Sequence, residues 1–191
     1  FVSGAAHADL IAFYRFDGNS NDSSGNGRDA TFTSATLDIG YEGQAYRFDG
    51  SSDYIRVPLN INPTELPQLT MGAWVLLDRA SAPGNFGATQ TFISHDNGSF
   101  DRTLDQDNRG GGGVNRFSAF SGTGGVLGGS PIETSAWVFI AARYDQTART
   151  VLLGARFRRM EGVRSSAPGG WDAVPRSPPS RGARGSSRCL S

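Results

Sequence analysis

The chain of 191 residues contains no lysine, so all 18 of its basic residues are arginines. It has one cysteine, Cys189, which excludes an intrachain disulfide. No apolar run approaches the roughly 18 residues of a membrane-spanning helix, so we predict no membrane span. The two histidines, His7 and His95, stand far apart with no cysteine near either, which argues against a zinc site.

The motifs of common hydrolases are missing as well. No G-x-S-x-G elbow accompanies His95, so a serine triad has no support. Glycosidases need two carboxylates close together, but the E-x-D-x-E pattern of jelly-roll glycanases is absent. Pairs of aspartates stay open, and each of the four glutamates stands alone: Glu42, Glu65, Glu133 and Glu161. We therefore predict no enzyme activity and no catalytic residue.

The net charge of zero is the sum of two unlike parts. Residues 1–154 hold 10 arginines against 16 acids, a balance of −6, and residues 155–191 hold 8 against 2, a balance of +6. From Ala155 the chain is rich in Arg, Pro, Ser and Gly and has no Ile, Asn, Thr or Tyr. This composition is typical of a disordered basic tail, for which nucleic-acid binding is an alternative function. We favour a shifted reading frame in a GC-rich gene, because the change falls inside an expected strand.

The first residues resemble the end of a signal peptide. Ala6-His7-Ala8 is an A-x-A-like cleavage site behind apolar residues, although a charged segment is absent. We interpret residues 1–8 as a signal-peptide remnant and predict a secreted or cell-surface protein.

Short apolar segments alternate with turn residues, and no segment has a sustained helical period. This pattern favours an antiparallel sandwich or barrel. Leu69–Leu77 is apolar on both faces, which predicts a central strand. The expected strands are Leu10–Phe16, Arg28–Thr33, Gln44–Phe48, Tyr54–Val57, Leu69–Leu77, Thr91–Ser94, Arg116–Phe120, Ala136–Tyr144 and Thr150–Leu153, the last two forming a hairpin.

The loop Asp17–Gly27 is made almost entirely of Asp, Asn, Ser and Gly. Its carboxylate, amide and hydroxyl oxygens are the ligands that calcium prefers. It is no EF-hand, because the sixth position is Asp22 and the twelfth is Arg28. The alternative is a tight turn whose side chains bond their own backbone. Trp74 and Trp137 also have two interpretations, stacking on a sugar or packing in the core, and their apolar neighbours favour the core.

Several motifs in a fixed order resemble the laminin-G-like, concanavalin-A-like jelly-roll domains. D-G-N-x-N-D-x-S-G-N-G stands at Asp17–Gly27, and G-x-A-x-x-F-D-G-S-x-D-Y at Gly43–Tyr54. Leu69–Val75 matches the family's A-W-V element, and Trp137–Asp145 its W-x-x-h-A-x-x-Y-D element. The resemblance covers Leu10 to about Leu153, and the family's closing strands do not appear after it.

The resemblance implies an all-β antiparallel β-sandwich of the jelly-roll type, incomplete at its C-terminus, over residues 9–154. It implies a non-catalytic binding or adhesion module for carbohydrate or an extracellular protein, with nucleic acid an unlikely partner. A jelly-roll glycoside hydrolase is the alternative. The family often carries a structural Ca²⁺, and the positions to which this implication transfers are Asp22, Ser24, Asn26, Asp53 and Asp145. The oligomeric state is not predicted.

Overall fold

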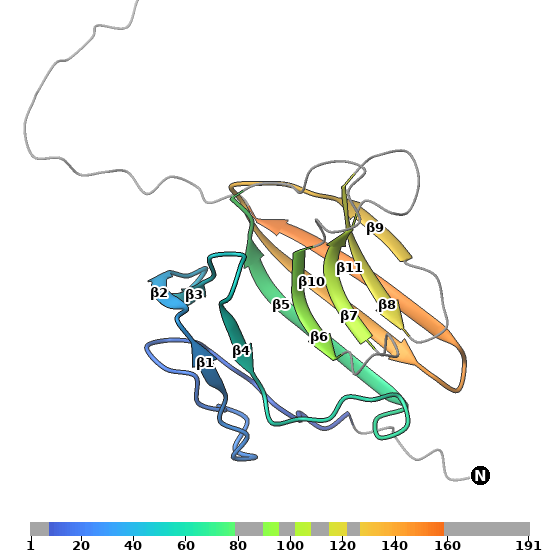
Figure 1. Ribbon diagram of the computed structural model, residues 1–191. Coiled ribbons are helices and arrows are strands. Elements are labelled where there is room, and N and C mark those ends of the chain that lie inside the picture. The colour runs from blue at the N-terminus through green and yellow to red at the C-terminus, as the bar shows by residue number, and fades with distance from the viewer. Residues whose placement is uncertain (1–7, 79–89, 96–101, 108–114, 122–126, 159–191) are drawn as a thin grey trace, which may run out of the picture. The chain divides into compact units, whose positions relative to one another are not determined.

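The computed structural model describes residues 8–78, 90–95, 102–107, 115–121 and 127–158. The chain divides into a unit Phe1–Met160 and a unit Glu161–Ser191, and the described residues all belong to the first. They form antiparallel β-strands without a helix (Figure 1). The all-β prediction is therefore confirmed for these residues, and no helix among them could span a membrane. Each of their sheets is open, so none closes into a barrel.

Two small sheets come first along the chain. β1 (Thr31–Thr33) pairs with β4 (Tyr54–Arg56), and β2 (Thr36–Ile39) pairs with β3 (Gln44–Arg47). β1, β3 and β4 fall inside segments expected to be strands, whereas β2 was not predicted. Short strands joined by Asx-rich turns therefore organise this N-terminal part.

A three-stranded sheet has the order β11-β10-β5. β5 is Gln68–Leu76, β10 is Trp137–Asp145 and β11 is Thr150–Arg158. The β10–β11 hairpin prediction is confirmed, and β11 continues to Arg158, beyond the start of the expected tail. The prediction that Leu69–Leu77 is central is wrong for the described strands, because among them β10 lies in the middle and β5 at the edge.

A four-stranded sheet has the order β6-β7-β8-β9. Its strands are β6 (Gln90–His95), β7 (Arg102–Asp107), β8 (Arg116–Ser121) and β9 (Leu127–Pro131). β7 and β9 were not predicted. The sequence RTLDQD of β7 is strongly polar, which is atypical of a strand, yet this strand is central and almost entirely buried.

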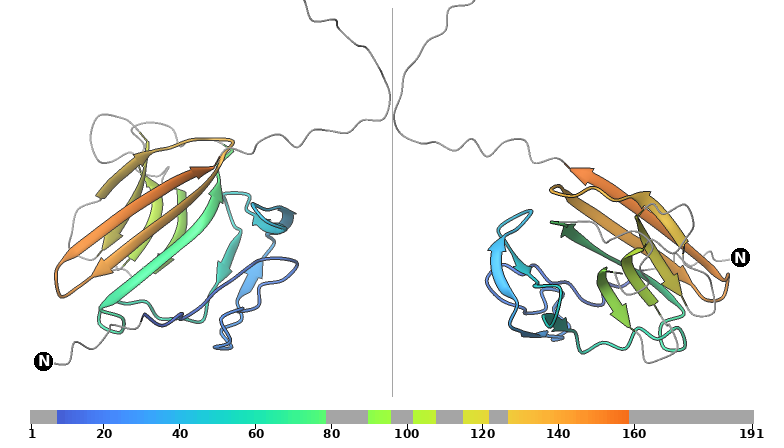
Figure 2. Two further views of the ribbon diagram at one scale, coloured as in Figure 1. Left: turned by 180° about the vertical axis from the view of Figure 1, so that it is seen from behind. Right: turned by 45° about the horizontal axis from the view of Figure 1, so that its top comes forward.

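The two larger sheets share one hydrophobic core. The side chains of β10 that alternate toward the core pack against residues of β7 and β8, with Leu77 beside them. Figure 2 shows β10 and β11 from two further sides. The buried members of this core are Leu77, Leu104, Phe117, Ala119, Val138, Ile140, Ala142 and Tyr144.

One expected strand does not form. Leu10–Phe16 contributes only an isolated bridge between Tyr14 and Asp22. Its backbone groups are engaged instead by side chains of the following loop, which compete with sheet pairing. The expected signal-peptide remnant falls mostly on residues 1–7, and most of the expected tail falls on residues 159–191. Both lie outside the described residues.

Candidate functional site

The carboxylate of Asp22 is the centre of the Asx-rich loop. Its Oδ1 accepts hydrogen bonds from the backbone N–H of Phe13 at 3.1 Å and of Ser24 at 2.9 Å. Its Oδ2 accepts from the Ser24 hydroxyl at 2.9 Å and from the Arg28 N–H at 3.1 Å. The Asp22 side chain thus ties its own loop to Phe13, nine residues earlier in the chain.

The same loop also holds the backbone carbonyls of the N-terminal segment. The Asn26 amide Nδ2 donates to the carbonyls of Leu10 and Ile11, both at 2.9 Å. The Arg28 guanidinium donates to the Ile11 carbonyl at 2.8 Å. These bonds explain why Leu10–Phe16 is held in place without becoming a strand. We call the network of Asp22, Ser24, Asn26 and Arg28 the Asx clasp.

The Asx clasp lowers the pKa of its own carboxyl group, that of Asp22. Desolvation acts to raise the pKa of Asp22, but hydrogen bonds from Ser24, Phe13 and Arg28 outweigh it and hold the pKa well below its ordinary value. Asp22 is therefore ionised at neutral pH, with N–H and O–H donors directed at both of its oxygens.

This arrangement does not fit a calcium ion without rearrangement. A calcium ion needs oxygen lone pairs directed at it, whereas both Asp22 oxygens and the Ile11 carbonyl accept hydrogen bonds from protein donors. The hydrogen bonds within the loop are those expected for the alternative interpretation, a turn whose side chains bond their own backbone. Calcium binding at the loop stays a prediction.

The other two expected ligands lie in separate turns. Asp53 accepts a hydrogen bond from the Asp49 N–H at 2.9 Å, inside the turn between β3 and β4. Asp145 ends β10 and accepts from the Gln68 side chain at 3.0 Å and the Ala148 N–H at 2.8 Å. The structure therefore brings Asp22, Ser24 and Asn26 together and gives Asp53 and Asp145 other partners. Within the described ranges, no three acidic, histidine or cysteine residues form a metal-binding group.

The Asx clasp is joined to a row of aromatic rings through Tyr14. The Tyr14 hydroxyl donates to the Arg28 carbonyl, and desolvation, followed by the charge of Asp22, raises the pKa of Tyr14. The Tyr14 ring stacks on Phe16 at a centroid distance of 5.7 Å, and Phe16 meets Tyr46 edge to face at 5.5 Å. Phe32 continues the row, 4.9 Å from Tyr46. We call these four residues the aromatic row.

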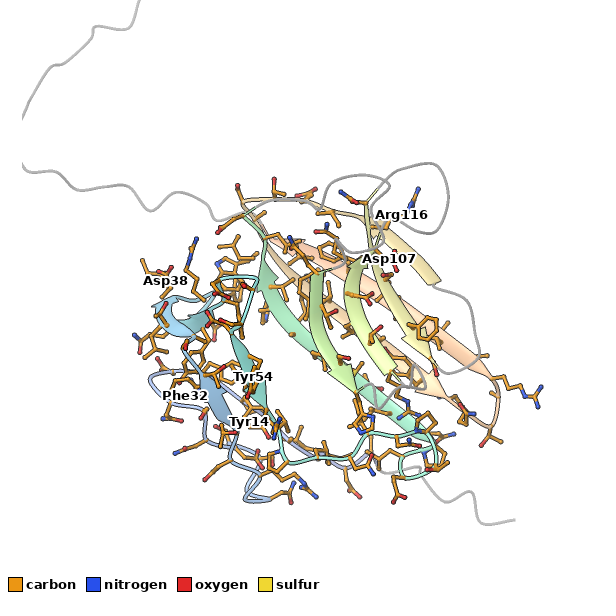
Figure 3. All side chains as sticks on the ribbon, in the orientation of Figure 1. Tyr14, Phe32, Asp38, Tyr54, Asp107 and Arg116 are labelled. Atoms are coloured by element: carbon orange, nitrogen blue, oxygen red, sulfur yellow. The ribbon has the colours of Figure 1, made fainter. Side chains whose placement is uncertain are left out.

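Two aromatic side chains of the β1–β4 pair are about half exposed to solvent. Phe32 is 47% exposed and Tyr54 48% exposed, and Figure 3 labels both on the β1–β4 pair. Because Phe32 is opposite Ile55 and Tyr54 is opposite Thr33, the two rings lie on opposite faces of this pair. The Arg56 guanidinium lies 5.8 Å from the centre of the Tyr54 ring. Half-exposed aromatic residues together with arginine are typical of interaction surfaces. Phe32 and Tyr54 fall in the segments Arg28–Thr33 and Tyr54–Val57, which were predicted to be strands, but their exposure was not predictable.

The two tryptophans for which sugar stacking was an alternative, Trp74 and Trp137, have other roles. Trp137 is buried, with 5% exposed, which confirms core packing. The Trp74 indole is covered by Tyr41 at a centroid distance of 3.8 Å and contacts Phe139 at 5.4 Å. Neither offers the open face that a sugar ring would need.

A second polar cluster, which the sequence did not reveal, lies on β7 and β8. Asp105 is 3% exposed and accepts hydrogen bonds from the Ser118 hydroxyl at 2.6 Å and the Thr103 hydroxyl at 2.9 Å. Asp107 lies on the same face of β7 two residues on and is directly opposite Arg116 of β8 (Figure 3). The polar sequence of β7 was the only available signal, and it argued against a strand.

No protein-family model, curated protein or solved structure matches this chain. The resemblance to laminin-G-like domains therefore rests on the order of the sequence motifs.

Proposed function

We propose that this protein is a secreted, non-catalytic binding module that recognises a carbohydrate or an extracellular protein through the face of the β1–β4 pair that carries Tyr54 and Arg56. We further propose that its fold is a jelly-roll β-sandwich. The proposal for the fold is supported by two antiparallel sheets that share a core and by the order of the laminin-G-like motifs. The observation that carries the functional proposal is the exposure of Tyr54, with the Arg56 guanidinium beside its ring, on a segment fixed by hydrogen bonds.

The chemistry of this surface suits either class of ligand. An aromatic ring offers a flat apolar face that is negative at its centre, to which polarised C–H groups or cations are attracted. Tyrosine and arginine are also the residues that contribute most to many protein interfaces. Because the Asx clasp and the turn at Asp49 hold the chain through side-chain hydrogen bonds, little conformational entropy should be lost on binding.

The binding test uses the full chain and two aromatic variants. The wild type is screened on a glycan array and against extracellular matrix proteins, and a ligand found is measured by calorimetry. We expect Tyr54→Ala to weaken binding by about 1–2 kcal/mol, as for interface residues of this type. Phe32→Ala changes a ring on the opposite face of the β1–β4 pair and should leave binding unchanged. Leu152→Ala is the control, because Leu152 is 63% exposed but lies on β11. Equal losses in all three variants, or none, would contradict the proposed surface.

Calcium is tested separately from ligand recognition. Calcium binding at the loop predicts a higher melting temperature with millimolar calcium than with EDTA, whereas a self-bonded turn predicts no difference. A bound ion at a hundredfold excess over its dissociation constant would add about 2.7 kcal/mol to stability. A calcium-dependent rise in melting temperature that Asp22→Asn abolishes would restore the family's metal site.

One observation favours a second candidate, a glycoside hydrolase. Asp105 and Asp107 lie on the same face of β7, about 6.6 Å apart along the strand at about 3.3 Å per residue. This spacing is within the range of carboxylate pairs in glycosidases. Hydrolysis of a β-glucan that is lost in Asp107→Asn but retained in Asp38→Asn would establish this alternative. Inactivity against a panel of glucans would leave the binding module as the function.

A further inference from the structure

The edges of the two larger sheets differ in how they are protected against pairing with another strand. An exposed edge strand is a template for association, and proteins block it with charges, prolines or bulges. β6 has a register shift between Thr91 and Ile93. β9 ends at Pro131 and has a register shift where it pairs with Arg116 and Ser118 of β8. β11 carries the exposed Arg156.

β5 has none of these features. Its sequence, QLTMGAWVL, contains no charge and no proline, and it pairs with β10 over nine consecutive residues without a register shift. Among the described strands β10 is its only partner. The residues that alternate along its outer face are largely accessible, since Gln68, Thr70, Gly72 and Leu76 are all exposed.

The sequence of β5 is complementary to itself in the antiparallel direction. When two copies are paired with their Gly72 residues opposite one another, Leu69 lies opposite Val75 and Met71 opposite Ala73 of the second copy. These four residues all point toward the core side, where Met71 and Val75 already pack against the buried cluster. On the outer face, Thr70 meets Trp74 and Gln68 meets Leu76. Every core-side pair is apolar, and no like charges meet.

We propose that the chain forms a two-fold symmetric dimer in which the β5 edges of two copies pair antiparallel, with Gly72 at the centre. The pairing joins two three-stranded sheets into one sheet of six strands. It satisfies the backbone groups along both free edges, and it is isologous, as most homodimer interfaces are. A shift of one residue would place core-side residues opposite outer-face residues, so the pleat excludes it. Centring the pair on Gly72 pairs all nine residues of each strand. This inference does not depend on the proposed aromatic binding surface.

The composition of residues 159–191 argues against this segment as the occupant of the β5 edge. Residues 159–191 hold only two β-branched residues, Val163 and Val174, among many arginines, prolines and glycines. Such a sequence has a low tendency to form a strand. A second copy of β5 supplies nine residues without a charge.

The first test measures association of the full-length protein by light scattering and analytical ultracentrifugation across a dilution series. We expect the wild type to be a dimer that dissociates on dilution. Thr70→Lys combined with Leu76→Lys should weaken the dimer roughly tenfold or more, with an unchanged circular dichroism spectrum. Thr150→Lys on β11 is the matched control and should dimerise as the wild type does. A wild type that is monomeric throughout, or a dimer that the double-lysine variant retains, would overturn the proposal.

The second test checks the register by cross-linking. In Gln68→Cys/Leu76→Cys/Cys189→Ser, each new cysteine lies opposite one on the second copy, at about 4.5–5.5 Å between Cα atoms. That distance suits a disulfide, whereas the two cysteines of one copy are about 26 Å apart along the strand. Oxidation should give a covalent dimer. Thr70→Cys/Leu76→Cys/Cys189→Ser places no cysteines opposite one another and should remain uncross-linked. Cross-linking in both variants, or in the control alone, would overturn the register.

Discussion

The ring of Tyr41 lies flat on the indole of Trp74, with centroids 3.8 Å apart and 10° between the two planes. Tyr41 belongs to the turn between β2 and β3, whereas Trp74 is in β5. The outer face of β5 is therefore partly covered by the N-terminal part of the chain, while Met71 and Val75 pack on its inner face. This explains how a strand with two apolar faces comes to lie at a sheet edge.

Replacing Tyr41 should loosen this contact. An aromatic pair contributes about 0.5–1.5 kcal/mol beyond the area it buries, so we expect Tyr41→Ala to lower the free energy of unfolding by at least that amount. Tyr41→Phe keeps the ring and should be close to the wild type. Urea denaturation followed by tryptophan fluorescence measures both. Equal stability of the alanine variant and the wild type would show that the stack contributes nothing.

Asp22 should make the protein sensitive to acid. Its pKa in the folded state is below the ordinary value of about 3.9, so its contribution to stability is complete above that value. The contribution is lost as the pH falls from about 4 toward the lower folded pKa. We expect Asp22→Asn to melt at a lower temperature at pH 7 and to lose part of the wild type's decline below pH 4. Asp9→Asn, outside the Asx clasp, serves as the control for the loss of one negative charge at pH 7.

Tyr144 should make the protein sensitive to alkali. Desolvation, followed by the charge of Asp105, raises the pKa of Tyr144 above its ordinary value, and its hydroxyl donates to the Thr103 carbonyl at 2.7 Å. Above about pH 10 the unfolded chain releases this proton and the folded chain does not, so stability falls as the pH rises. We expect Tyr144→Phe to be less stable by about 1 kcal/mol at pH 7 and to decline less steeply above pH 10. An unchanged alkaline slope would contradict this assignment.

Gln106 should limit stability rather than support it. Its side chain is fully buried, and neither amide atom has a hydrogen-bond partner among the described residues. Because such a group costs about 1–3 kcal/mol, we expect Gln106→Met to raise the free energy of unfolding by about 1 kcal/mol. Ser118→Ala makes the opposite comparison: it removes the 2.6 Å hydrogen bond to Asp105 and should destabilise by about 1.5–3 kcal/mol. A destabilised Gln106→Met would show that the amide has a partner.

The sequence alone predicted most strands wherever apolar residues alternate beside turns. β10 and the β10–β11 hairpin follow from such a pattern, as do β3, β4 and β5. It failed at Leu10–Phe16, because the side chains of Asp22, Asn26 and Arg28 take up backbone groups that a neighbouring strand would otherwise bind. It also failed at β7, where the buried Asp105 finds one partner along the same strand, Thr103, and another across the sheet, Ser118.

For the candidate site, composition indicated that Asp17–Gly27 would be an oxygen-rich loop, and the local spacing of Asp, Ser and Asn determined its self-bonded turn. Local sequence fixes such features because the bonding groups are only a few residues apart. Only the tertiary structure decided that Asp53 and Asp145 lie in separate turns, that Phe32 and Tyr54 are exposed, and that β5 is an edge. These properties depend on which segments distant in sequence pack together, and hydrophobic periodicity does not encode that choice.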